Sequence, residues 1–183
     1  MKTLGWLLLT VVAFALTVVV SGWTSYQDVR KYAIWITKPV DPAAAEFGGV
    51  RLSVDAARAR ILNDQPDRAI VYVRMIMRGK ADTLKTWVPC EMGLTDSGGR
   101  VWLPVSGLVD RSSTRILIDQ GDEDVSCDKA AFRAEGDDQP ATAMQAYLVP
   151  EDALKDLSLR VSSAATRPDA VSIPIKPVLR RGP

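Results

Sequence analysis

The sequence predicts an all-β domain, an antiparallel β-sandwich, that follows one N-terminal transmembrane helix. Three observations predict this fold class. The chain begins with a long uncharged apolar run, which is typical of a membrane-spanning helix. Apolar and polar residues alternate in several later segments, as in half-buried strands. Turn-forming residues separate about eight such segments, and no long amphipathic helical pattern interrupts them.

Residues 1–27 are predicted to be an uncleaved transmembrane anchor in contact with membrane lipid. Beyond Lys2 the segment carries no charge, and a spanning helix needs about 20 apolar residues. Trp6 lies near one end of the run, and Trp23 and Tyr26 lie near the other, where interfacial aromatic residues are expected. The alternative is a cleaved secretory signal, but signal cores are typically about 7–15 residues and no A-x-A cleavage site follows.

The charges on either side of the apolar run permit both orientations, because Lys2 precedes it and Arg30 and Lys31 follow it. The signal-like N-terminus and the cysteine usage favour export of the rest of the chain. We therefore expect a single-pass protein of the cell membrane. Its N-terminus would be cytoplasmic and its C-terminal domain extracytoplasmic, in the cell envelope.

Residues 28–47 are predicted to form a juxtamembrane helix and then a linker. Apolar residues from Tyr26 to Ile36 recur at helical spacing, so the spanning helix can continue beyond the membrane. This extension would either contact a partner near the membrane surface or act only as a stalk. Pro39 and Pro42 then end the helix and form a stiff, extended spacer.

Residues 48–175 are predicted to form the β-sandwich. "DSGG" at 96–99 supplies residues that tolerate the positive φ of a hairpin turn, and "PEDALKD" at 150–156 is predicted to be a short helical or tight loop. Residues 176–183 are predicted to be a frayed tail, or alternatively a basic tail that touches anionic polymer or lipid. The candidate strands are 50–54, 69–77, 88–94, 100–104, 114–118, 142–149, 157–161 and 170–175.

Three stretches carry a resemblance to a known family. "GGVRLSVDAARA" opens the domain, the pattern C-x-M-x-L-T-D-x-x-G-R-V-W lies in its middle, and "YLVPEDALKDLSLRV" lies near its end. With these stretches the chain resembles a family of small exported immunoglobulin-like bacterial domains of unknown function. The resemblance implies an immunoglobulin-like sandwich anchored to a membrane or to lipid at the cell surface. It brings no catalytic residues to this chain.

The chain has two cysteines, Cys90 and Cys127, and Cys90 has two interpretations. As a nucleophile it would need a base to form a thiolate, and the chain has no histidine. As half of a disulfide it would pair with Cys127, which suits an exported domain. We expect the disulfide, because an apolar strand face is a poor setting for an exposed thiolate.

Two further groups of residues are candidate binding sites. Trp87 and Trp102 flank the 96–99 turn, where they would either pair across a hairpin or form an exposed surface for a ligand or partner. The acidic stretch 119–128 carries the carboxylates of Asp119, Asp122, Glu123, Asp124 and Asp128. Its spacing does not match a calcium-binding loop, so we expect a solvated acidic loop and leave cation binding open.

The composition narrows the possible functions. The chain has 183 residues, a formal net charge of +1 and no long basic block, so we expect no nucleic-acid partner. The absence of histidine excludes Ser-His-Asp and Cys-His catalysis and most zinc and copper sites. We therefore expect a non-enzymatic protein without a cofactor or metal that binds or scaffolds another envelope protein. The alternative is a surface module that binds a small ligand or glycan near Trp87 and Trp102.

Overall fold

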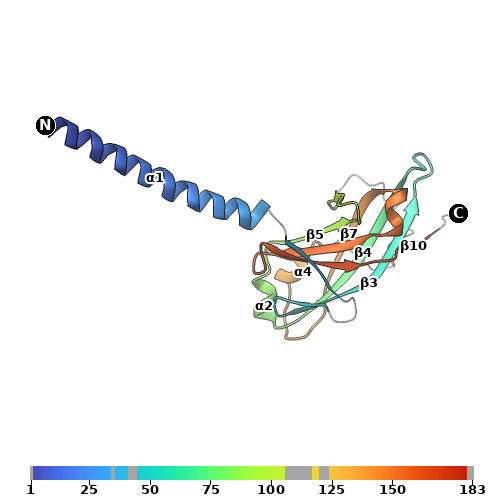
Figure 1. The fold of residues 1–183 in the computed structure, drawn as a ribbon. Coiled ribbons are helices and arrows are strands. Elements are labelled where there is room, and N and C mark those ends of the chain that lie inside the picture. The colour runs from blue at the N-terminus through green and yellow to red at the C-terminus, as the bar shows by residue number, and fades with distance from the viewer. Residues whose placement is uncertain (1, 34–35, 41–44, 106–116, 120–123, 181–183) are drawn as a thin grey trace.

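The computed structural model describes residues 2–33, 36–40, 45–105, 117–119 and 124–180 (Figure 1). One long N-terminal helix leads into a body built mainly from β-strands. The strands form two sheets, so the predicted N-terminal apolar helix and mostly β body are both confirmed.

Helix α1 spans Lys2–Ala33, 32 residues, and is therefore about 48 Å long. Its segment Leu9–Gln27 has a mean hydropathy of 1.6 and packs against nothing else in the described chain. Length and composition therefore allow α1 to cross a membrane, and a signal sequence would have the same properties. The helix exceeds a hydrocarbon core of about 30 Å, so several turns would lie beyond it.

Three threonine hydroxyls of α1 form hydrogen bonds within the helix itself. The Thr10 and Thr17 hydroxyls each donate to the carbonyl oxygen four residues earlier, at 2.9 Å. The Thr24 hydroxyl donates in the same way to Val20 O at 3.2 Å. Because lipid offers no hydrogen-bond partners, such internal bonds let a polar side chain enter a bilayer at low cost.

The first sheet has the strand order β1-β9-β8-β5-β6 and the second has the order β10-β3-β4-β7, with β2 also pairing with β3. The strands of the first sheet are β1 (Ile36–Pro39), β5 (Cys90–Thr95), β6 (Val101–Trp102), β8 (Ser158–Ser163) and β9 (Asp169–Pro174). Those of the second are β2 (Glu46–Phe47), β3 (Val50–Ile61), β4 (Arg68–Arg78), β7 (Ala141–Pro150) and β10 (Val178–Leu179).

Most strand pairs are antiparallel, as the sequence predicts, but the two edge pairs β1–β9 and β10–β3 are parallel. Neither edge strand is joined to its neighbour by a short hairpin, and a long connection permits parallel pairing. Both edge strands come from segments predicted to lie outside the domain. Ile36–Pro39 lies in the expected linker and Val178–Leu179 in the expected tail.

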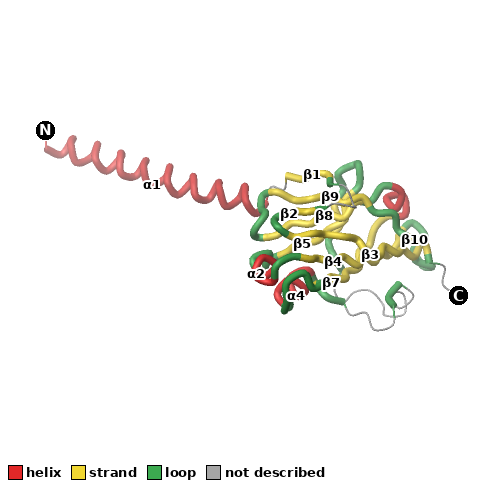
Figure 2. Tube along the Cα trace, turned by 90° about the horizontal axis from the view of Figure 1, so that it is seen from below, coloured by secondary structure: helices red, strands yellow, loops and turns green. Residues whose placement is uncertain are grey.

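Among the described residues, three short helical elements join the strands: α2 (Ala81–Lys85), α4 (Cys127–Phe132) and the 3-10 helix η1 (Glu151–Lys155). Only η1 coincides with a helical segment expected from the sequence. The predicted strand 114–118 falls mostly outside the described residues, and its last two residues, Leu117 and Ile118, form a turn and a bend. Figure 2 shows α2 and α4 together at one end of the body, the end at which α1 joins it.

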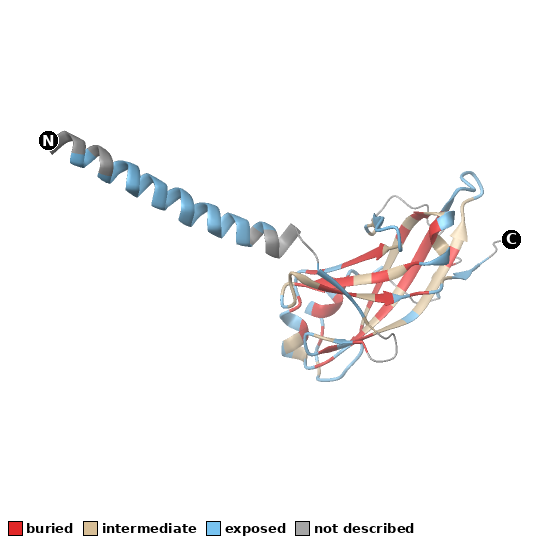
Figure 3. Ribbon diagram, in the orientation of Figure 1, coloured by how far each residue is buried: buried red, intermediate tan, exposed pale blue. Residues whose placement is uncertain are grey.

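The core lies between elements of both sheets. Buried side chains of β3, β4 and β7 join those of β5, β8 and β9 in one hydrophobic cluster, and Figure 3 shows buried residues along the strands. The alternation that predicts β3 is visible in its burial, since Val50 and Leu52 are buried while Arg51 is exposed. On β4, residues of both faces are buried, which explains its nearly continuous apolar sequence.

Candidate functional site

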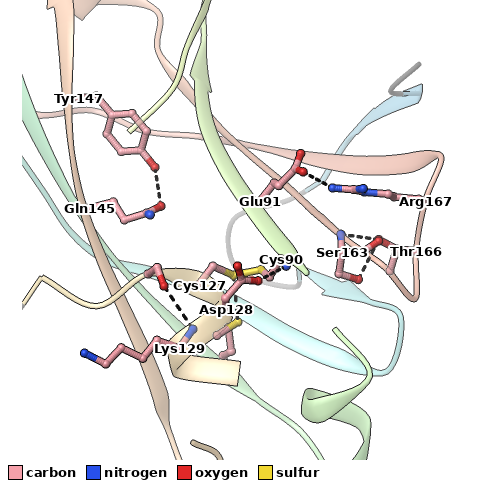
Figure 4. The surroundings of a disulfide bond; sticks show 12 residues. Cys90, Glu91, Cys127, Asp128, Lys129, Gln145, Tyr147, Ser163, Thr166 and Arg167 are labelled. Carbon is pink, nitrogen blue, oxygen red and sulfur yellow. Dashed lines mark hydrogen bonds and ion pairs between the residues drawn. A yellow bond between two sulfur atoms is a disulfide. The ribbon is translucent and has the colours of Figure 1, made fainter. Parts of the chain in front are cut away.

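The described structure joins Cys90 and Cys127 as a disulfide (Figure 4). Cys90 is the first residue of β5, Cys127 is the first residue of α4, and both are buried. Their Cα atoms lie 5.4 Å apart, within the roughly 7 Å that a disulfide requires. The pair therefore holds a short helix against the end of a strand, and it presents no thiol for nucleophilic chemistry.

Two hydrogen bonds near the disulfide also hold α4 in place. The Asp128 carboxylate accepts from the backbone N–H of Cys90, so the two chain segments are joined a second time (Figure 4). The Ser126 hydroxyl accepts from the Lys129 N–H at 3.3 Å and caps the N-terminus of α4. Cys127, Ala130 and Ala131 face inward. These contacts make the region a structural clamp.

Trp87 is not part of a surface, contrary to the alternative expectation of a ligand site. It follows α2 and is completely buried. Its ring packs edge-on against Phe47, with centroids 6.2 Å apart and an interplanar angle of 87°. Its indole N–H donates to Gly48 O at 3.5 Å. Trp87 therefore ties the β2–β3 turn to the core, and no ligand can stack on it in this conformation.

Trp102 lies in β6, opposite Leu94 of β5, and is half-buried. The Arg100 guanidinium lies over its ring, 5.3 Å from the centroid. The expected Trp87–Trp102 pair does not form, because Trp87 precedes β5 and the β5–β6 ladder is only two residue pairs long. Of the two tryptophans expected to form an aromatic surface, only Trp102 is therefore partly accessible.

The charged side chains around Trp102 stabilise the 96–99 turn. Arg100 Nε lies 2.6 Å from an Asp96 carboxylate oxygen, and its NH2 group lies 3.1 Å from Asp152. Desolvation opposes ionisation of Asp96, but the hydrogen bonds and charge of Arg100 lower its pKa overall. The same bonds raise the pKa of Arg100. These contacts fix the hairpin predicted from "DSGG", in which Gly99 has a φ of +79°.

The structure describes three of the acidic residues of 119–128, namely Asp119, Asp124 and Asp128. Asp119 pairs with Arg58 at 2.6 Å and with Arg74 at 3.5 Å, and the Arg58 hydrogen bond lowers the pKa of Asp119. Burial raises the pKa of Asp124. Asp122 and Glu123 lie outside the described residues. Within the described part of the chain, no three acidic, cysteine or histidine side chains form a group suited to a metal ion.

A hollow of about 230 Å³ lies beside β3, between Ser53–Ala57 and Pro174–Lys176. The register of β3 shifts here, between Val54 and Ala56. The Asp55 carboxylate is 2.6 Å from Arg74, so this charge is already paired. Pockets that hold drug-sized ligands usually have volumes of about 300–1,000 Å³, and this hollow is smaller than that.

Sequence reasoning missed one surface feature, the outer face of α4. Lys129, Phe132 and Arg133 are exposed there, and Phe132 has 72% of its surface in solvent. The signal was present as an aromatic between two cations at i, i+3 and i+4 spacing. A helix of six residues is too short for that spacing to stand out in a single sequence.

Comparisons with sequence families, curated proteins and solved structures were made for the whole chain. No family model and no curated protein matches the sequence. Among solved structures, the chain is similar to a protein of Staphylococcus aureus subsp. aureus NCTC 8325 described as a "putative lipoprotein". The two share 12% sequence identity and a TM-score of 0.40, over 72% of this chain and 88% of that one.

Proposed function

We propose that this chain is a non-enzymatic, membrane-anchored extracytoplasmic domain that binds or scaffolds another envelope protein. The main support for this proposal is the exposed apolar surface of helix α1. Its long apolar segment contacts no other part of the described chain, and its threonine hydroxyls are bonded within the helix. Exposing an apolar surface to water costs a free energy of about 25 cal/mol per Å², and insertion into a bilayer removes that cost. The helix and the small β body together suit a tethered surface module.

We further propose that the two sheets form an immunoglobulin-like β-sandwich. One hydrophobic cluster drawn from both sheets supports the packing of sheet on sheet. One feature differs from antibody domains, in which a disulfide joins strands of the two sheets beside a buried Trp. Here Cys90 of β5 is joined instead to helix α4, although Trp87 is buried nearby in sequence.

The proposed topology places the β body outside the cytoplasm. The Cys90–Cys127 disulfide supports this orientation, because disulfides persist in oxidising compartments and are rare in the cytosol. The N-terminus with Lys2 then lies in the cytoplasm. Lipid contacts are made by residues 1–27.

Small side chains on one face of α1 support a partner within the membrane. Thr10, Ala13, Thr17, Ser21 and Thr24 fall on one side of the helix at 100° per residue. Small residues let two spanning helices approach closely, which drives association in lipid. A scaffold could therefore hold its partner through α1 as well as through the β body.

Affinity purification from detergent-solubilised membranes tests the scaffold. Three chains are compared: the natural chain, a chain whose residues 1–33 are replaced by an unrelated spanning helix, and the natural chain with Thr10 and Thr17 changed to Leu. A stoichiometric partner on the natural chain supports the proposal, and its loss in either variant assigns the contact to α1. The absence of any stoichiometric partner on the natural chain would contradict the scaffold.

A further inference from the structure

Helix α1 and the body are separated by a short stretch of sequence. Helix α1 ends at Ala33 and strand β1 begins at Ile36, so two residues separate them. Ile36 is held in the first sheet, opposite Asp169, and its N–H donates to Pro168 O at 2.9 Å. We name the end of the body that contains Ile36 the tether end.

Helices α2 and α4 belong to the tether end. Cys90 pairs with Ser163 in the first sheet, at the same end as Ile36, and the disulfide brings Cys127 and α4 there. Figures 1 and 2 show both helices where α1 meets the body, from two directions. With α1 in a bilayer, these helices are closer to the lipid surface than the opposite end of the strands.

The outer face of α4, defined by Lys129, Phe132 and Arg133, has the composition of a membrane-contact surface. Phe132 is 72% exposed, although Phe is usually among the more buried residue types. A cation lies on each side of it, three residues before and one residue after. Interfacial helices combine apolar side chains that enter the headgroup layer with Lys or Arg that meets lipid phosphates.

The reach of α1 permits this contact. Trp23 and Tyr26 are suited to the outer membrane interface, and from Tyr26 to Ala33 the helix rises only about 10 Å. A modest tilt of α1 of about 20°, which is average for spanning helices, brings the tether end nearer to the headgroups. The clamp formed by Cys90–Cys127 and the Asp128 hydrogen bond keeps the face of α4 in a fixed position.

Acidic residues also lie at the tether end, and they limit the size of the contact. Asp82 of α2 is exposed beside Lys85, at 3.9 Å, and Asp124 is exposed close to Lys129. Glu135, Asp137 and Asp138 are exposed just beyond α4, and the Asp137 carboxylate accepts from the Ala81 N–H at the start of α2. An extended basic surface is therefore absent from this described region. The contact is confined to Phe132, Lys129 of α4 and Arg133, which directly follows the helix.

We propose that the Lys129, Phe132 and Arg133 face of α4 docks on the bilayer that holds α1. In this arrangement Phe132 enters the headgroup layer, and Lys129 and Arg133 contact lipid phosphates. The inference rests on the proposed membrane anchoring. It adds a second contact that orients the β body relative to the membrane and leaves the opposite end of the strands facing a partner.

Photo-crosslinking of the full chain in vesicles of phosphatidylcholine and phosphatidylglycerol tests this docking. The photoreactive residue p-benzoylphenylalanine replaces Phe132 in one chain and Leu103 in a matched control. Leu103 is 68% exposed and follows β6, which pairs with the end of β5 away from Cys90. Both positions are on the surface, so neither replacement disturbs the core, and disulfide formation is checked in each chain.

We expect lipid adducts at position 132 several-fold above those at position 103. The double substitution K129E and R133E should reduce the adducts at position 132 when phosphatidylglycerol is present. Equal adducts at the two positions, or adducts at 132 with protein alone, would overturn the docking. Carbonate extraction of the same vesicles separates the two proposals. Release of the chain overturns the anchoring and the docking together, whereas a retained chain without selective adducts overturns the docking alone.

Discussion

Removal of the disulfide should destabilise the β body strongly. We consider the double substitution of Cys90 and Cys127 to Ala, which leaves no unpaired thiol. The two cysteines are 37 residues apart in sequence, and the chain-entropy model gives about 4 kcal/mol for closing a loop of that length. Domain stabilities are typically about 5–15 kcal/mol, so the loss is a large fraction of the total.

The structure indicates which contacts weaken with the disulfide. Without the bond, α4 is held by its buried alanines and by the Asp128 carboxylate on the Cys90 N–H. The entropy of the unfolded chain rises at the same time. Both effects favour unfolding, because the folded state loses a clamp and the unfolded state gains freedom.

Urea unfolding of the full chain in detergent, followed by near-ultraviolet circular dichroism, measures the loss. With a urea m-value of about 2 kcal/mol/M, the midpoint should fall by about 2 M. Adding a reductant to the natural chain should reproduce this fall and should leave the double variant unchanged. A natural chain whose midpoint is insensitive to the reductant, together with two freely alkylated cysteines, would show that no disulfide stabilises the β body.

Three further predictions concern the stability of the β body. Gly48→Ala should lower the free energy of unfolding by about 1–3 kcal/mol, since Gly48 has a φ of +55° and an added Cβ would lie 2.6 Å from Thr166 Cγ2. Gly99 has a φ of +79° and nothing within 4 Å of an added Cβ, so Gly99→Ala should lower it less in the same urea titration. Trp87→Ala should lower the free energy of unfolding, measured by thermal unfolding, by about 3–5 kcal/mol. A loss as small as that of a surface substitution would show that Trp87 is not in the core. Because the Arg58 hydrogen bond lowers the pKa of Asp119, the stabilisation from ionised Asp119 should be present at neutral pH and should be lost as the pH falls below about 4. Asp119→Asn should flatten this part of the profile of stability against pH. An unchanged profile would contradict the Arg58–Asp119 pairing.

Periodicity made the main elements of the fold predictable. The uncharged apolar run predicts α1, and the alternation around Val50 and Leu52 predicts β3, because helices and strands repeat their apolar residues at different spacings. The disulfide was predictable because an exported chain with two cysteines favours their pairing.

The edge strands were less predictable, because tertiary context decides them. Pro39 argues for a spacer, yet it ends β1, an exposed edge strand in which a missing N–H is tolerated. β10 has only two residues and no pattern of its own.

The candidate site was predicted only in part. Trp87 looks like half of a cross-strand pair, but α2 redirects the chain into the core before β5 begins. The role of α4 depends on its contact with Cys90, which lies far away in sequence. Such a contact cannot be derived from local spacing.

Thiol labelling of spheroplasts with a membrane-impermeant maleimide tests whether α1 is an uncleaved anchor and the β body lies outside the membrane. One chain carries Ser97→Cys, in the exposed turn before β6, and another carries Lys2→Cys, before the apolar run of α1. Position 97 should be labelled in intact spheroplasts, while position 2 should remain in the chain and be labelled only after lysis. Labelling of position 97 only after lysis, or loss of position 2 from the mature chain, would contradict an uncleaved anchor with an external β body.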